Sequence, residues 1–586
     1  MRTLPAASAA QAPQPAQVLP RATWARDDAS GEAAADGASL ARARVGAVGA
    51  GEVGIGGQIL RTFGASAKRA STIRLLDCLV AQSGQGNLTA AKIDGNKRLV
   101  ASRPPAGARK EGTLPMLRSA LLILSGNAAA SILLLARNLL IARLIPVADY
   151  GVAATFAIAM SVVEMVSAFG LQQQIIQAKN GDDPHFQAVL QGFQIMRGVA
   201  SGLLLFALAG PIADLLNVPE AAWGHRVMAL VPVLNALAHF DIHRLNRQNR
   251  FGPMIVSSTV PALASLLAVW PLVAWLEDWR AMLFVILIQA VLTTAVSHLV
   301  AERPYRIALD RKIMAGSLRF GWPLLLNNVL LFLVFNGDRI IVGRVLGMEA
   351  LAIFSMGVTL TLTPTLVMAK SLQNFFLPRL SQAAHALEDG AGRPRFVDLS
   401  QATFQGALLN GSLLVLAVLI AGGPFVLLAL GPKYADLVPL LNLMAVLQAV
   451  RVAKAGSSIV ALALGRTGNA AIANLMRLLS LPIAWLALLQ GEGLVAVLWI
   501  GIAGEALGYA VSLQLVRRRL HLPLRPMLGP LLATGLLLMT AIVANSFEAI
   551  PFWAAEIAAA LFFALQIVSM KELRQRISAA LQRKPR

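Results

Sequence analysis

The segment RNLLIARLIPVADYG, from Arg137 to Gly151, is repeated further along the chain as DRIIVGRVLGMEALA, from Asp338 to Ala352. The copies match apolar for apolar, and Arg143 of the first corresponds to Arg344 of the second. Each copy follows one long apolar stretch and precedes another, so each should end one helix and begin the next. The second copy begins 201 residues after the first. A repeat at this offset indicates two similar halves in the same orientation. Chance similarity between apolar segments is the alternative, and the shared arginine weighs against it.

Apolar segments of about twenty residues fill the chain from Met116 onward, broken by short basic connections. Hydrophobic residues make up 56% of the 586 residues and charged residues 14%, and the mean hydropathy is +0.65. A soluble chain of this length needs a larger charged surface. The sequence therefore predicts an all-α polytopic membrane protein with about fourteen spans, at roughly 119–143, 151–171, 188–210, 224–240, 254–276, 281–300, 322–346, 350–371, 404–430, 437–464, 469–490, 493–515, 527–545 and 551–569.

The repeat divides these spans into two lobes of six helices each, followed by two extra helices. We expect an N-terminal lobe at residues 116–320, a C-terminal lobe at 321–520, and two extra helices with a basic tail at 521–586. Residues 1–115 are rich in Ala, Gly, Ser and Arg and lack a spanning apolar stretch. They are expected to be a disordered or mis-annotated extension, with a real cytoplasmic extension as the alternative. The only cysteine, Cys78, lies there, so no disulfide is expected in the membrane part.

The net charge of +21 is explained by topology. With an even number of spans and a cytoplasmic N-terminus, the opposite connections hold only scattered cations: Arg143, Arg226, Arg280, Arg344 and Lys433. The inside connections and the C-terminal tail hold dense clusters, such as the three arginines from Arg517 to Arg519. By the positive-inside rule both termini are cytoplasmic, and nucleic acid is not an expected partner.

Several motifs resemble one transporter family. They are LLIARLIPVADYG, ending at Gly151, GLQQQIIQ (170–177), NGDRIIVGRVLG (336–347) and FFLPRLSQ (375–382). In this order they are similar to the polysaccharide exporter and Wzx-type flippase family of the multidrug/oligosaccharidyl-lipid/polysaccharide exporter superfamily. The family's usual Leu-Gly-x-Tyr-Ser is here Leu351-Ala352-Ile353-Phe354-Ser355, which puts any role for that tyrosine in doubt.

The resemblance implies a function. It implies a transporter that moves an undecaprenyl-pyrophosphate-linked oligosaccharide across the bacterial inner membrane, for exopolysaccharide, capsule or O-antigen synthesis. A polysaccharide polymerase and a chain-length regulator are the implied partners. Alternating access would come from one lobe rocking against the other.

Polar residues inside the predicted spans are the candidate site residues, because an ionisable group in hydrocarbon is costly unless it faces a cavity or a partner. Arg451 and Lys454 are three residues apart and share a helix face, so together they need an anion, and a pyrophosphate would suit them. Glu164 and Asp338 are candidates for ion coupling. The other substrate-binding candidates are Arg137, Arg339, Asn127 and Asn328.

Each candidate has a structural alternative. Long side chains near the end of a span can extend to the membrane surface, which applies to Arg137, Arg143, Arg339 and Arg344 in the last ten residues of their spans. The same alternative holds for Arg477, which lies a turn or two from the inside surface. Asp338 and Arg339 can neutralise other charges in the bundle. Glu164 can form a structural ion pair, for example with Arg137.

Other function classes receive little support. The bundle contains no G-x-x-x-x-G-K-[ST] loop and no H-E-x-x-H motif, so we expect neither an enzyme nor a cofactor or metal. His239 and His243 are four residues apart but lie beside arginines at a helix end, where a solvated loop is the simpler interpretation. A membrane-embedded polymerase or ligase would need a large outer loop, whereas the longest predicted loop, 372–403, is inside. A multidrug or cation antiporter stays the main alternative, although it would favour an acidic cavity.

Overall fold

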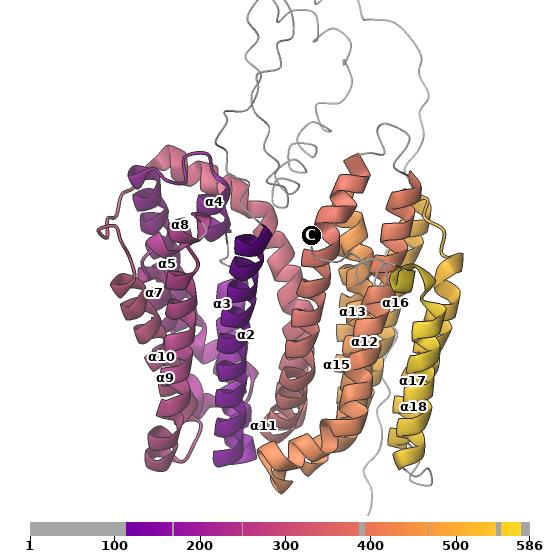
Figure 1. The fold of residues 1–586 in the computed structure, drawn as a ribbon. Coiled ribbons are helices and arrows are strands. Elements are labelled where there is room, and N and C mark those ends of the chain that lie inside the picture. Colours follow the sequence, from indigo (N-terminus) through magenta and orange to yellow (C-terminus); the bar gives the residue numbers. More distant parts are fainter. Residues whose placement is uncertain are drawn as a thin grey trace, which may run out of the picture. The chain divides into compact units, whose positions relative to one another are not determined.

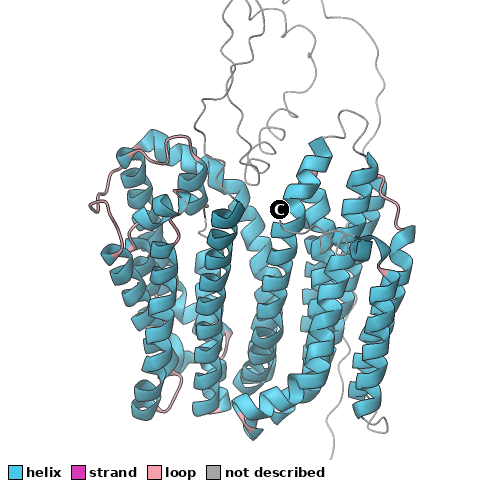
Figure 2. Cartoon of the chain, in the orientation of Figure 1, coloured by secondary structure: helices cyan, strands magenta, loops and turns pink. Residues whose placement is uncertain are grey.

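The computed structural model describes residues 113–166, 169–248, 250–385, 393–466, 468–546 and 552–575. Within these ranges the chain is helical and contains no strand (Figure 2). The predictions about the N-terminal extension, Cys78 included, fall on residues outside the described ranges.

The described helices follow one another with short connections (Figure 1). Three of them are short 3-10 helices: η1 (Pro219–Ala221), η2 (Pro432–Leu437) and η3 (Arg525–Met527). The α-helices are α2 (Thr113–Leu144), α3 (Val147–Val166), α4 (Leu171–Gln177), α5 (Pro184–Leu215), α6 (Ala222–Met228), α7 (Leu230–Leu237), α8 (Asp241–Arg247), α9 (Gly252–Leu276), α10 (Arg280–Leu299), α11 (Arg311–His385), α12 (Arg393–Leu430), α13 (Val438–Ala463), α14 (Gly468–Leu478), α15 (Ser480–Leu489), α16 (Leu494–Leu520), α17 (Leu528–Ser546) and α18 (Phe552–Ser569).

Ten segments among the described residues are long and apolar enough to cross a membrane. One of them, Asn328–Ala384, has 57 residues, far more than the ~20 that one crossing needs. It is divided at Gly347, whose φ of 87° and ψ of −174° are not helical. Gly347 lies inside the second copy of the repeat, and the first copy contains the break between α2 and α3. Both copies therefore end one helical segment and begin the next.

Helix α3 packs along α11, and this contact brings the two copies of the repeat together. A Cβ on Gly151 would lie only 2.0 Å from the carbonyl oxygen of Met348, so the close approach requires glycine. Side chains on both sides of this contact are fully buried, among them Ile141, Ala153 and Val342.

Neighbouring helices extend from this contact to both sides. α9 packs on α2 and α10, and α5 packs on α6 and α7. On the other side α13 packs on α11, α12 and α16, while α17 and α18 pair with each other and cover α12 (Figure 1).

Three sequence predictions need correction. Most of the predicted loop 372–403 is helical, because α11 continues to His385 and α12 begins at Arg393. Backbone hydrogen bonding does not require an apolar sequence, so a helix can continue beyond a membrane-spanning stretch. The predicted spans 224–240 and 469–490 are each divided, into α6 and α7 and into α14 and α15. Pro232 and Pro482 stand third in α7 and α15, where a proline ring disfavours a continuous helix from the preceding turn.

Candidate functional site

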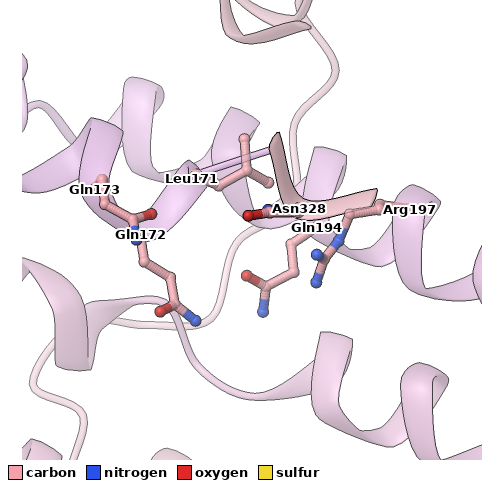
Figure 3. Close-up of a pocket in the computed structure, with 7 residues that line it drawn as sticks. Leu171, Gln172, Gln173, Gln194, Arg197 and Asn328 are labelled. Carbon is pink, nitrogen blue, oxygen red and sulfur yellow. The ribbon is translucent and has the colours of Figure 1, made fainter. Parts of the chain in front are cut away.

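A polar cavity of about 240 Å³ lies between α4, α5 and α11; we call it the α4–α11 cavity. Amide side chains from all three helices line it, together with one guanidinium group. Its polar lining residues are Gln172, Gln173, Gln194, Arg197 and Asn328. Figure 3 shows Gln194 and Arg197 next to each other on α5, with Gln172 on the other side of the cavity. The positive φ of Gly170, 66°, turns the chain into α4 and so places its glutamines at the cavity.

Arg197 connects this cavity with Glu164. The positive charge of Arg197 acts on the Glu164 carboxyl, whose helix, α3, ends just before α4. Arg197 and the three glutamines were missed by the sequence analysis. The signal was the run Gln172–Gln174 after an apolar span, and an arginine inside the predicted span 188–210.

A buried charge network joins four helices of the C-terminal half. Glu505 of α16 is fully buried and accepts from Arg451 Nε at 2.8 Å and from Lys454 Nζ at 2.6 Å, both on α13. Arg477 of α14 lies 3.5 Å from the same carboxylate and also pairs with Asp338 of α11. Three cations thus share two carboxylates in the interior.

This network changes the interpretation of two predictions. Arg451 and Lys454 share one helix face as expected, but Glu505 already supplies an anion to both. Arg477 is fully buried, so the alternative that it extends to the membrane surface is wrong. Asp338 pairs with Arg477, as a charge-neutralising role requires.

Arg137 and Arg339 both interact electrostatically with Tyr150. Arg137 is 7% exposed and donates to Asn138 at 3.1 Å and to Gln289. Arg339 donates to the carbonyl oxygen of Ser355 at 3.4 Å, and both guanidinium charges act on Tyr150. No ion pair between Glu164 and Arg137 occurs in the part of the chain that the structure describes.

The repeat arginines Arg143 and Arg344 make reciprocal contacts at helix ends. Arg143 donates to the carbonyl oxygens of Leu428 and, at 3.2 Å, of Ala429 in the last turn of α12. Arg344 donates to the carbonyl oxygen of Asp214 in the last turn of α5, at 3.1 Å. The last carbonyls of a helix lack backbone partners and carry partial negative charge, so they attract cations. Each copy of the repeat therefore holds a helix of the opposite half.

Further contacts support these two helix ends. Arg344 also donates to the side chain of Asn217, which returns a bond to the Arg344 carbonyl oxygen at 3.2 Å. Near the other end, Lys433 donates to the carbonyl oxygen of Ile145. We call the bonds of Arg143 and Arg344, together with those of Asn217 and Lys433, the arginine clasp.

The remaining predicted residues are not brought together. Asn328 lines the α4–α11 cavity, whereas Arg451 and Lys454 belong to the network around Glu505. The side chain of Asn127 lies outside the described part. No group of three or more His, Cys, Asp or Glu residues within the described ranges could hold a metal ion.

Residues 140–439, about half of the chain, match the sequence pattern of a family described as polysaccharide biosynthesis protein. The chain belongs to this family. The prediction of a polysaccharide exporter family from the motifs is thereby confirmed.

Curated relatives of this family member are distant. Succinoglycan biosynthesis transport protein ExoT of Rhizobium meliloti is 22% identical over 254 residues, which are 42% of this chain and 50% of that protein. Teichuronic acid biosynthesis protein TuaB of Bacillus subtilis is 23% identical over 58% of this chain and 69% of that protein. Lipopolysaccharide biosynthesis protein WzxC of Escherichia coli is 23% identical, over 53% of this chain and 62% of that protein. The similarity spans about half to two thirds of these relatives.

Two solved structures show the fold of this family member. The lipid II flippase MurJ, in an inward closed conformation, matches with a TM-score of 0.59 at 14% identity, over 78% of this chain and all of that one. An inward-facing multidrug resistance transporter of the MATE family matches with a TM-score of 0.56 at 13% identity, over 67% of this chain and 94% of that one. At such low identity these likenesses concern the fold alone.

Proposed function

We propose that this protein is a flippase that moves undecaprenyl-pyrophosphate-linked oligosaccharides across the bacterial inner membrane. Membership of a polysaccharide biosynthesis family supports this, as do relatives named for the transport or synthesis of polysaccharides. The fold, shared with a lipid II flippase, is consistent with it. The observation that carries the proposal is the α4–α11 cavity, in which a guanidinium and several amides meet. Guanidinium groups bind phosphate oxygens, and amides hydrogen-bond to sugar hydroxyls.

The proposed topology has fourteen crossings with both termini cytoplasmic. Ten apolar segments provide eleven crossings, because Asn328–Ala384 turns back at Gly347. α2, the pair α6 and α7, and α18 supply the others. We infer two six-helix lobes, 116–320 and 321–520, followed by two extra helices.

Alternating access requires the lobes to close at one end of the bundle while the other end opens. The arginine clasp is placed to close one end, since each repeat arginine holds a helix of the opposite lobe. The α4–α11 cavity lies elsewhere on α5 and α11, with Arg197 eighteen residues before the end of α5. In the proposed orientation the clasp is periplasmic and the cavity is cytoplasmic.

We propose separate roles for the predicted site residues. Arg197 and Asn328 would bind the substrate on entry, and Arg137, Arg339 and Asn127 would contact it farther along. Glu164 would couple transport to an ion through its interaction with Arg197. Arg451 and Lys454 would bind the substrate when its phosphate displaces Glu505 from them. Arg477 would then change partners as well and release Asp338.

The main alternative is a cation antiporter, because the fold is also that of a MATE transporter. The composition of the α4–α11 cavity argues against it, since its lining contains Arg197 and amides but no carboxylate among the described residues. A cationic substrate would leave that guanidinium facing a like charge.

The test is polysaccharide export in cells that lack their own exporter. We expect the intact chain to restore export, Arg197→Ala to reduce it at least about tenfold, and Arg197→Lys to restore part of it, because lysine keeps the charge without the planar fork. Arg226→Ala is the matched control, since Arg226 is exposed and its side chain forms no hydrogen bond or ion pair in the described part of the chain. Membrane abundance is measured for each variant. Efflux of a cationic dye without restored export would overturn the proposal.

A further inference from the structure

A second cavity, of about 200 Å³, lies within the N-terminal half and shares no residue with the α4–α11 cavity. We call it the Arg306 cavity. The first turns of α5, the connection between α7 and α8, and the connection between α10 and α11 surround it. Its polar lining residues are Gln187, Gln191, His239, Arg303 and Arg306.

His239 contributes a weakly satisfied donor to this cavity. Its side chain is 3% exposed, and Nδ1 accepts the backbone N–H of Asp241 at 3.1 Å. Burial lowers the pKa of His239, so the ring is neutral at pH 7 and carries its proton on Nε2. That nitrogen is buried and makes no hydrogen bond of ordinary geometry within the described ranges, and the backbone of Arg303 acts on the ring only as a weak partner. Because a buried donor is stabilised by a well-placed acceptor, a ligand that accepts from Nε2 is favoured.

Two arginines and a helix end add positive charge. Arg303 is fixed by its bonds to Gln187 at 3.0 Å and to the Asp182 carbonyl oxygen at 2.8 Å. Arg306 is exposed and makes no hydrogen bond or ion pair with the rest of the described chain. Pro184, another lining residue, is the first residue of α5, and the beginning of a helix attracts anions.

Nearby carboxylates do not cancel this charge, because each has its own partners. Hydrogen bonds, first from Gln248 and then from Arg247, hold the pKa of Asp182 below its ordinary value. Burial raises the pKa of Asp241, but the bonds from Arg244 and from two backbone N–H groups outweigh it and keep the carboxyl ionised. Asp183 caps α5 by accepting the His185 N–H at 3.0 Å. Arg306 is therefore the cation that an incoming anion would meet.

We propose that the Arg306 cavity binds a phosphate-bearing lipid headgroup at the membrane surface. Arg306 would grip the phosphate oxygens, and His239 Nε2 would donate to the same group or to the ester next to it. Two lipids present this chemistry: an anionic phospholipid, and a polyprenyl pyrophosphate before it enters the α4–α11 cavity. The cytoplasmic position of the cavity rests on the proposed orientation, but binding itself does not depend on transport.

The experiment uses the purified full chain in detergent, titrated with dioctanoyl phosphatidylglycerol and with farnesyl pyrophosphate, and the Kd of each is measured by calorimetry. Dioctanoylglycerol, which lacks phosphate, is the ligand control. We expect Arg306→Ala to weaken binding of at least one phosphate lipid about tenfold, and Arg306→Lys to recover part of the affinity. His239→Phe should weaken binding of the phosphate lipid as well. Its unfolding temperature should equal that of the parent protein, which shows that the variant is folded. Loss confined to phosphatidylglycerol would assign a bulk lipid, and loss confined to the pyrophosphate would assign the carrier.

Arg311→Ala is the matched control, because Arg311 is an exposed arginine in the same region that does not line the cavity. Equal weakening by Arg311→Ala would overturn the site in favour of general surface charge, and unchanged affinity in Arg306→Ala would overturn it outright. Arg197→Ala tests the other cavity separately. If it abolishes export but leaves phosphatidylglycerol affinity unchanged, the two sites are distinct, and the failure of one leaves the other standing.

Discussion

Glu505→Gln should be among the most destabilising single substitutions in the membrane bundle. The carboxylate is fully buried and lies 2.6 Å from Lys454 Nζ, 2.8 Å from Arg451 Nε and 3.5 Å from Arg477 Nε. Removing one partner of a buried ion pair costs about 3–5 kcal/mol, because the other charge stays buried without compensation. Glu505 contacts all three cations of the network and is the carboxylate partner of Arg451 and Lys454, so we expect a loss near the upper end, about 5 kcal/mol. Asp338 cannot replace it, since Asp338 contacts only Arg477 among these cations.

The assay is thermal unfolding of the purified protein in one detergent, followed by size-exclusion fluorescence. Glu556→Gln in α18 is the matched control: Glu556 is partly buried, forms no ion pair in the described chain, and should change stability by no more than about 0.5 kcal/mol. Adding Lys454→Met to Glu505→Gln removes one of the unpaired cations and should recover part of the loss. If Glu505→Gln unfolds at the temperature of Glu556→Gln, the network does not stabilise the bundle and the reasoning fails.

Three further predictions concern transport and topology. Arg451→Ala should reduce polysaccharide export strongly, and Arg451→Lys less, at unchanged membrane abundance; normal export in Arg451→Ala would leave this arginine a purely structural role. Replacing both Arg143 and Arg344 by Ala removes hydrogen bonds of the arginine clasp that stabilise the closed end by about 1 kcal/mol per arginine. Spin labels at the ends of α5 and α12 should therefore show a wider distance distribution than in the parent. Reporter fusions after Arg319 should report cytoplasm and those after Gly347 periplasm; the reverse pattern at both sites would invert the proposed orientation.

The sequence predicted much of the helical order because apolar length and charge placement are local properties. Segments of about twenty apolar residues have to be helical in a membrane, where every backbone group needs an internal partner. The break at Gly347 and the matching break between α2 and α3 followed from the repeat alone. The divided helices were missed, since Pro232 and Pro482 interrupt a helix without interrupting hydropathy.

The candidate site could be predicted from the sequence only in part. The sequence placed Arg451 and Lys454 on one face but could not select Glu505 as their partner, which lies more than fifty residues further along the chain. Arg477 looked like a residue near the surface until packing placed it between Glu505 and Asp338. Pairing of charges between helices depends on the rotation of each helix about its own axis, and hydropathy leaves that rotation undetermined.

The sequence alone determined the family, the membrane character and the presence of a repeat. Each of these can be recognised in segments of consecutive residues. The reciprocal contacts of Arg143 and Arg344, and the meeting of α4, α5 and α11 around Arg197, were decided only by the tertiary structure. These contacts join residues far apart in the chain, and their geometry depends on how closely α3 and α11 approach. That approach is set by packing, through the missing side chain of Gly151 against the backbone of Met348.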